Sequence, residues 1–413
     1  MLSPLRVPRT AALLFGLAAL IPGTVAAQQP VGPRVRDSLA APAEKPAKGW
    51  RLRTELGLAE AYDNNVFLLD TGGKSKLAAP SPGQVTSGRY ANMESASDLI
   101  TTLSAVLDVQ GPGLSGRTFT ITPAVAYEFY LQNPKRSHAL IGLSLEQSMA
   151  KKGRLRLQGA LRPNYFAKNY LADAVDADAN GSISSNERVY AAGVYSESEL
   201  TLDYRFRLAA STNKHPFGAT LMAGVGYGNR TYEPPFAGKD LKGPMAAVNF
   251  RMSLSPKVSL GLDYAYAAFS GTPTDQIQLL DEPSFGQDFN GNGNTTDQNV
   301  AVVSLVDPSR TENAIGGGVN FALGLHSALE LAYEYRLRNY SSTDPLDVAH
   351  TNRQDARNQL GAQFKFGLGK ALGMNIGGTY TSQTTNRPND PGATGDTNDY
   401  TRFVAALGLT YIF

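Results

Sequence analysis

The sequence contains no cysteine, one tryptophan and four histidines among 413 residues. The lack of cysteine excludes disulfide bonds, iron–sulfur clusters, cysteine-ligated zinc, thiol catalysis and lipid attachment through a cysteine. Beyond residue 27, no stretch approaches the roughly 18 consecutive apolar residues that a membrane-spanning helix requires. These absences leave proteins without iron–sulfur or thiol redox chemistry and without a helical membrane anchor.

Residues 1–27 have the pattern of an export signal. Arg6 and Arg9 precede an apolar run at residues 11–21, and the small residues 25–27 suit a signal peptidase. Removal of the two arginines leaves 36 basic and 36 acidic side chains. A chain without net charge is not expected to bind nucleic acid. A soluble exported protein and an outer-membrane barrel remain as classes.

Residues 28–49 are rich in proline, alanine and charge, and we expect them to form a disordered periplasmic tether. From residue 50 to 413 the hydrophobic pattern has the two-residue period of strands, in segments of about ten to sixteen residues separated by turn residues. The sequence therefore predicts one all-β domain of about fourteen strands, near 50–62, 98–110, 117–131, 137–150, 154–170, 188–208, 217–232, 244–255, 258–269, 311–324, 327–340, 352–368, 373–384 and 401–413.

The last segment has one face that is apolar up to the final residue, Phe413, with Tyr411 two positions earlier. An aromatic terminal residue on an apolar strand is similar to the ending that the assembly machinery of bacterial outer-membrane barrels reads. A soluble sandwich or propeller would also alternate, but it would explain neither this ending nor strands longer than the usual 5 to 6 residues. An antiparallel transmembrane β-barrel is the favoured fold class.

The connections between the predicted strands alternate in length. Short turns, such as those at residues 111–113 and 255–257, alternate with long polar loops near 63–97, 171–187, 270–310 and 385–399. Outer-membrane barrels have short periplasmic turns and long outer loops. An even strand number then places both termini in the periplasm of a Gram-negative bacterium, with membrane lipid and lipopolysaccharide around the barrel.

Alternation along the strands predicts which side chains face the lumen. In the segment 117–131, Phe119, Ile121, Val125, Tyr127 and Phe129 face outward, whereas the threonines and Glu128 face inward. The same parity predicts a pore lining of both signs: Arg154, Arg156, Arg162, Glu197, Glu199, Asp203, Arg205, Glu330, Glu334, Arg336, Arg353, Asp355 and Arg357. These charges either stiffen the wall as cross-strand ion pairs or sort solutes in an aqueous pore.

The loop after the fifth strand contains a complete D-x-D-x-N-G-x5-E calcium motif. Calcium takes six to eight oxygen ligands, and Gly181 permits the sharp turn that such a loop needs. The predicted ligands are Asp176, Asp178, Asn180, Ser182 through its carbonyl group, Ser184 and Glu187. Strands flank the loop, so it resembles the calcium loop of EF-hand proteins without their helices. We expect a structural calcium ion; the alternative is an ordinary polar outer loop.

A second loop begins in the same way, with Asp288, Asn290, Asn292 and Asn294 in the ligand positions. It has Asn299 where the motif requires a bidentate acid, and the nearest acid is Asp297. This loop is the weaker calcium candidate.

The sequence contains no catalytic motif. The four histidines are scattered, and none lies in a Ser-His-Asp, H-E-x-x-H or nucleophile-elbow context. Only Asp344, Asp347 and His350 lie close enough in one outer loop to activate a water molecule, as an outer-membrane hydrolase would require. A solvated polar loop is the strongly favoured explanation of the three residues. We expect no enzyme.

The hexapeptide Tyr62-Asp63-Asn64-Asn65-Val66-Phe67 ends the first predicted strand. It resembles the Tyr-Asp-(Asp/Asn)-Asn-(Val/Ile)-Phe element with which a family of β-barrel porins of Gram-negative bacteria begins. The resemblance covers this element and the overall layout. It implies an outer-membrane barrel, sometimes associated with the export of surface polysaccharide or protein, and it carries no catalytic residues.

Two functions from different classes fit the sequence. The first is a passive, porin-like channel for small hydrophilic solutes with a calcium-braced outer loop. The second is a non-conducting surface barrel whose outer loops bind an extracellular or polysaccharide partner or assist export. Transport of a fatty-acid type is a third alternative, weakened by the lack of an apolar hatch in the sequence.

Overall fold

The computed structural model describes residues 49–79, 88–150, 153–209, 218–324, 326–369, 371–386 and 399–413. The predicted export signal and nearly all of the predicted tether lie outside these residues. The barrel strands are β1 (Arg51–Asp63), β2 (Asp98–Pro112), β3 (Thr118–Tyr130), β4 (His138–Ala150), β5 (Gly153–Ala174), β6 (Arg188–Ala209), β7 (Gly218–Tyr232), β8 (Leu241–Ser253), β9 (Val258–Phe269), β12 (Arg310–Ala322), β13 (Ser327–Tyr340), β14 (Gln354–Gly367), β15 (Leu372–Thr385) and β16 (Tyr400–Ile412).

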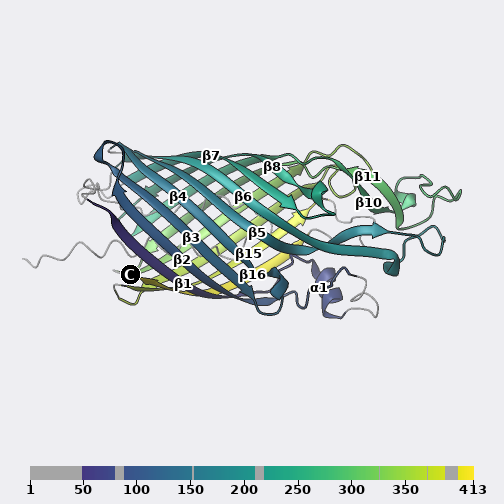
Figure 1. Cartoon of the computed structure of the whole chain (residues 1–413), viewed down its shortest axis with the longest axis horizontal. Coiled ribbons are helices and arrows are strands. Elements are labelled where there is room, and N and C mark those ends of the chain that lie inside the picture. Colours follow the sequence, from purple (N-terminus) through teal and green to yellow (C-terminus); the bar gives the residue numbers. More distant parts are fainter. Residues whose placement is uncertain are drawn as a thin grey trace, which may run out of the picture.

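These fourteen strands form a closed antiparallel barrel in which each strand pairs with its sequence neighbour and β9 pairs with β12 (Figure 1). The first and last strands close it, with Glu55 opposite Ile412 at one end of the seam and Asp63 opposite Val404 at the other. A closed barrel satisfies every ladder hydrogen bond and leaves no edge, which is why such structures can cross a bilayer. The predicted fold class and all fourteen predicted strands are confirmed.

The outer face of the barrel is apolar and exposed. Leu58, Leu103 and Val225 are 43, 49 and 61% exposed and lie on the outward parity of their strands. On β3, Tyr127 and Phe129 are exposed while Glu128 is buried, as the alternation predicts. A water-soluble protein would bury so large an apolar surface, and a lipid-facing wall does not need to.

The two ends of the barrel differ. Short turns join the strands at the end where β1 begins and β16 ends, whereas the other end carries the long loops (Figure 1). We call this second end the outer end. There, β5 and β6 have 22 residues each, whereas β4 has 13, so the paired β5 and β6 extend about 30 Å beyond β4.

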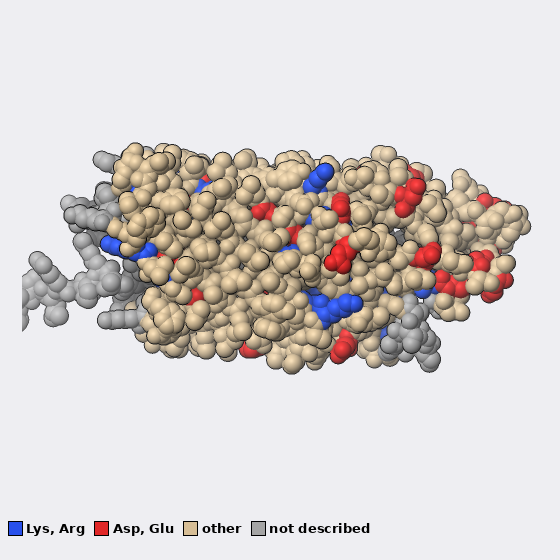
Figure 2. Space-filling model, viewed as in Figure 1, with Lys and Arg blue, Asp and Glu red and all other residues tan. Residues whose placement is uncertain are grey.

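The outer loops contain structure that the strand pattern did not predict. The loop after β1 includes a helix, α1 (Thr71–Ala78), and the loop after β9 contains a separate hairpin, β10 (Thr274–Leu280) with β11 (Val300–Val306). Among the described residues no helix is long and apolar enough to cross a membrane. In Figure 2 the barrel wall is mostly uncharged, and acidic side chains gather at the end that holds β10 and β11.

Candidate functional site

Most of the predicted pore-lining side chains form ion pairs inside the barrel, either across neighbouring strands or along one strand. Arg156 donates to Asp203 at 3.2 Å, and Arg162 pairs with Glu197. On the opposite wall, Glu334 accepts from Arg357 at 2.8 Å and from Arg336 at 3.1 Å. Further pairs join Arg154 to Glu146 and Lys365 to Glu330, at 2.8 and 2.7 Å. Arg353 lies one residue before β14, not within the strand, and binds Asp355 at 2.8 Å.

The interior is more tightly filled in its outer half than in its inner half. Near the outer ends of their strands, Asp355 and Arg357 are only 1 and 4% exposed. Toward the short turns, the side chains of Glu330 and Glu146 are 42 and 24% exposed. Most of the buried charged side chains therefore lie in the outer half, although Arg156 and Asp203, nearer the short turns, are also buried.

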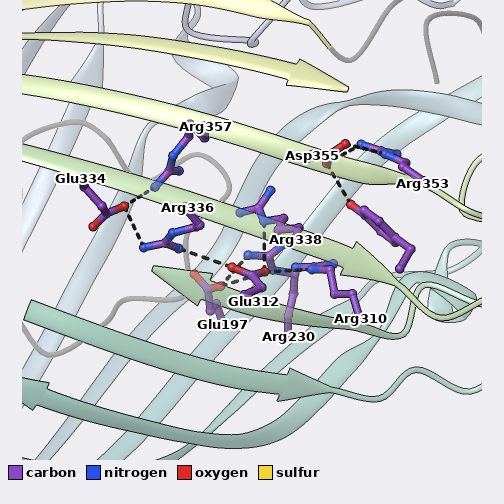
Figure 3. Close-up of polar contacts among 11 residues, drawn as sticks. Glu197, Arg230, Arg310, Glu312, Glu334, Arg336, Arg338, Arg353, Asp355 and Arg357 are labelled. Atoms are coloured by element: carbon purple, nitrogen blue, oxygen red, sulfur yellow. Dashed lines mark hydrogen bonds and ion pairs between the residues drawn. The ribbon is translucent and has the colours of Figure 1, made fainter. Parts of the chain in front are cut away.

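Four arginines share two glutamates on strands β12, β13 and β14 (Figure 3). Glu312 accepts from Arg310 at 2.8 Å, from Arg338 at 3.1 Å and from Arg336 at 3.4 Å. We call these residues, together with Glu334 and Arg357, the arginine cluster. Sequence reasoning had not singled out Arg310 or Glu312, although both have the inward parity of β12 and alternation alone would have found them.

Arginines also stack on tyrosine rings along the inner wall of β5, β6 and β7. The guanidinium carbon of Arg162 lies 4.5 Å from the ring centre of Tyr165, and that of Arg230 lies 4.6 Å from that of Tyr195. Arg230 also donates to Glu197 at 2.7 Å. Packing of this kind keeps the arginine side chains fixed and adds cation–π attraction to the ion pairs.

The hexapeptide at residues 62–67 joins the barrel seam to the first outer loop. Tyr62 is exposed on the lipid-facing side, while Asp63 faces inward and binds Arg402. Asn65 is fully buried, and its amide donates to the carbonyl groups of Leu69 and Thr401 at 2.7 and 2.9 Å. These side-chain bonds replace the ladder bonds that end with β1.

The same loop packs on the inner wall at the outer rim. Val66 and Phe67 contact a cluster that includes Ile100 and Val404, both on the inward parity of their strands. The guanidinium carbon of Arg136 lies 4.7 Å from the ring centre of Phe67. The loop thus narrows the barrel mouth on this side.

The predicted calcium loop brings its acidic residues together. Ligand oxygens of Asp176, Asp178 and Glu187 lie within 4.8 Å of one another. Asp176 accepts from the backbone of Gly181 at 2.8 Å, and Gly181 has a φ of +87°, a conformation that favours glycine. Hydrogen bonds from the side chain and backbone of Ser184 lower the pKa of the Glu187 carboxyl group to about 2.

The remaining predicted ligands hold the loop in this shape. Asn180 accepts from the Ser182 backbone at 2.8 Å, and the Ser184 hydroxyl donates to Glu187 at 2.5 Å. The Asn180 amide donates to Asp178 at 2.9 Å. Carboxylate, amide and hydroxyl oxygens are the ligands that calcium prefers, so this donor set fits the ion.

In the second loop the acid that converges on the amides is Asp297. It accepts from Asn290 and Asn294 at 3.0 and 2.9 Å, and these bonds lower the pKa of its carboxyl group. Asn299 instead links the two loops: it accepts from Arg188 at 2.9 Å, and its carbonyl group accepts from the Ile183 backbone at 3.0 Å. Asp288 accepts from the backbones of Gly291 and Gly293 at 2.7 and 2.6 Å.

Asp347 and His350 form a buried pair inside the loop between β13 and β14, 3.0 Å apart. Asp347 also accepts from the Asp307 backbone at 2.9 Å, which ties this loop to the end of β11. Asp344 accepts from the Leu346 backbone and shapes the turn. Both carboxylates and the imidazole are occupied in holding the outer loops together.

No protein-family model and no curated protein matches the sequence. The solved structures that resemble the chain include outer-membrane porins and channels. The anion-selective porin from Comamonas acidovorans is 11% identical, with 88% of this chain and 99% of that chain covered and a TM-score of 0.38. The channel DcaP of Acinetobacter baumannii is 10% identical (88 and 97% covered, TM-score 0.40), and a mutant of the monoaromatic hydrocarbon channel TodX is 9% identical (88 and 90% covered, TM-score 0.41). Likenesses this distant carry no information about substrate or partner.

Proposed function

We propose that the protein is an outer-membrane channel for small hydrophilic solutes. The observation that carries the proposal is the combination of an exposed apolar outer wall with an interior lined by charges of both signs. Fourteen strands enclose more space than side chains alone fill, because eight strands already enclose a tightly filled interior and sixteen form open channels. The facing charges create a transverse field that sorts solutes by size and charge.

The layout of the ends supports an outer-membrane location with both termini in the periplasm. Arg51 begins β1 and Ile412 ends β16 at the end with the short turns, which is the periplasmic end in bacterial barrels. The loop-bearing end would then face the outside of the cell.

We further propose that the loop at residues 176–187 binds calcium. Its three carboxylates converge, and like charges this close repel one another unless a cation neutralises them. The ion would brace the extension of β5 and β6 and, through the Ile183 backbone bond to Asn299, the neighbouring loop. The second loop, with Asp288 and Asp297, is the weaker site.

The test is single-channel conductance of the refolded protein in a planar bilayer, with and without millimolar calcium. Discrete steps are expected, with calcium lowering the noise from loop movement. A folded barrel that stays silent would contradict the channel. It would favour the second function, a surface barrel that binds an extracellular or polysaccharide partner, which the close filling of the outer half also fits.

A further inference from the structure

The loop between β10 and β11 contains the sequence Asn290-Gly291-Asn292-Gly293, in which each asparagine precedes a glycine. An asparagine side chain can react with the backbone nitrogen of the next residue to form a cyclic imide. A following glycine hinders this attack least, because it has no side chain and adopts many backbone conformations. Asn292 and Gly293 are both exposed, so water reaches this part of the chain.

Three hydrogen bonds place Asn292 for this reaction. The Gly293 N–H group donates to the Asp288 carboxylate at 2.6 Å. The Asn292 side-chain oxygen accepts from the Asn294 backbone at 2.7 Å, and its amide nitrogen donates to Asp297 at 2.5 Å. A carboxylate at this distance can accept the proton of the attacking nitrogen. A backbone N–H group on the carbonyl oxygen stabilises the negative charge that develops there during the attack.

The loop at residues 176–187 contains an equivalent step, Asn180-Gly181, in more crowded surroundings. The Gly181 N–H group also donates to a carboxylate, that of Asp176, at 2.8 Å. A Cβ atom added at Gly181 would lie 2.8 Å from the Asn290 amide nitrogen, whereas one added at Gly293 would meet no atom of the described residues within 4 Å. Ring closure requires the side chain and the following backbone to rotate toward each other. The open space at Gly293 permits this rotation, and the packing at Gly181 opposes it.

We propose that Asn292 deamidates spontaneously in the folded protein, with Asp288 as the base. The Gly293 nitrogen forms a bond to the Asn292 Cγ atom while its proton passes to Asp288. The bond between Cγ and Nδ2 then breaks, and the proton leaves with the amide nitrogen as ammonia. Water opens the resulting imide at either of its C–N bonds, which gives aspartate or isoaspartate.

The reaction would supply an acid that the second loop lacks. Among its ligand positions only Asp288 is acidic, and Asn299 stands where the calcium motif requires a bidentate acid. A carboxylate at position 292 would lie beside Asp297, and like charges this close favour a bound cation. The inference thus deepens the proposed calcium binding of this loop, and it rests on that proposed function only for this consequence.

The test follows the refolded barrel in micelles, in water enriched in oxygen-18 at mildly alkaline pH. Peptide mass spectrometry locates the reaction, because opening of the imide inserts oxygen-18 at residue 292. A synthetic peptide of residues 286–298 gives the rate for the same sequence without the fold. Asn292 is expected to react at least tenfold faster in the barrel than in the peptide, and Asn294, which precedes a threonine, should keep its amide. An equal or slower rate in the barrel would overturn the proposal.

Asp288→Asn tests the base. The variant keeps an oxygen that can accept the Gly293 hydrogen bond but cannot take up its proton, so the reaction should slow at least tenfold. The matched control is Asp275→Asn, the same change at an exposed residue of β10 outside the loop, which should leave the rate within twofold. An unchanged rate in Asp288→Asn would refute the role of the base. The comparison of barrel and peptide needs no substitution, so it decides even if this variant disturbs the loop.

Asn292→Asp tests the consequence for calcium. In a protein that also carries Asp176→Ala, which removes the first calcium site, this substitution should restore calcium binding in isothermal titration. Absence of heat would overturn the calcium role of the modified loop. Binding by the first loop is decided separately by Asp176→Ala alone, and the channel function is decided by conductance, so failure of one proposal is distinguishable from failure of the others.

Discussion

Asp63 and Arg402 lie 339 residues apart in the sequence, and the Arg402 Nε donates to the Asp63 carboxylate at 2.9 Å. Asp63 is the last residue of β1, and Arg402 is the third residue of β16, so the pair closes the seam at the outer end of the barrel. Both side chains are almost completely buried. The ion pair thus joins the two ends of the barrel where the first outer loop begins.

Substitution of Asp63 by Asn should destabilise this seam. Removing one partner leaves the Arg402 charge buried without its counterion, which typically costs about 3–5 kcal/mol. We expect a lower midpoint of urea unfolding in micelles, followed by the gel mobility of the folded barrel. Tyr62→Phe, a neighbouring change on the lipid-facing side, is the control and should stay within about 0.5 kcal/mol of the unmodified protein. An unchanged midpoint for Asp63→Asn would show that the ladder alone holds the seam.

Substitution of Phe67 by Ala should loosen the loop that narrows the mouth. Phe67 is 3% exposed, and truncation of a buried phenylalanine costs about 3–5 kcal/mol. Residues 64–79 should lose protection from hydrogen exchange, and the single-channel conductance should rise. Leu99→Ala, on the exposed outer face, is the control and should change neither measurement. Increased exchange without a change in conductance would mean that the loop does not limit the passage.

Calcium binding should depend on the acids of the loop at residues 176–187. Isothermal titration of the unmodified barrel is expected to show binding, which Asp176→Ala and Glu187→Ala should each abolish because each removes carboxylate ligands. Asp173→Asn, which removes an acid three residues before the loop, should retain binding. If titration of calcium into the unmodified protein releases or absorbs no heat, the proposed calcium site is wrong.

The loop between β13 and β14 should become less stable as the pH falls. Burial lowers the pKa of His350, against the hydrogen bond to Asp347, while Lys239 and Arg353 also lower it. The folded loop therefore holds His350 neutral and the unfolded loop takes up a proton first. The loop therefore has its full stability above pH 6.5, the usual pKa of a histidine side chain, and becomes less stable as the pH falls below that value.

Hydrogen exchange of residues 341–353, corrected for the intrinsic rate, measures this effect between about pH 7.5 and about pH 5.5. Exchange should be faster at the lower pH in the unmodified protein. His350→Asn should remove the pH dependence while exchange in β14 stays unchanged. A pH dependence that persists in the variant would assign it to another group.

Much of the barrel could be predicted because the side-chain period of a strand is local. Alternation alone predicts that Tyr127 and Phe129 face outward and that Glu128 faces inward. The alternation is strong because the outer side chains contact lipid and the inner side chains are charged. The calcium motif is also local, since twelve consecutive residues contain all its ligands. Alternation also predicts that Arg310 and Glu312 face inward, although neither is among the predicted pore-lining residues.

The hairpin of β10 and β11 was hidden for a different reason. Its strands have seven residues each and lie within the 40-residue connection between β9 and β12. The β11 sequence, VAVVSLV, is apolar on both faces, so it lacks the alternation of polar and apolar side chains by which the barrel strands are predicted. The inward packing of Phe67 could not be predicted from the sequence either, because its partners Ile100 and Val404 come from strands that meet only when the barrel closes.

The sequence by itself determined the strand number, the faces and the two candidate calcium loops, because each depends on the order of neighbouring residues. Only the tertiary structure decided which charges meet. Closure brings Asp63 to Arg402, and pairing of β6 with β7 sets Glu199 opposite Gly228 instead of an arginine. Register places every side chain against a particular partner, and register is fixed by the whole ring of strands, not by any one of them.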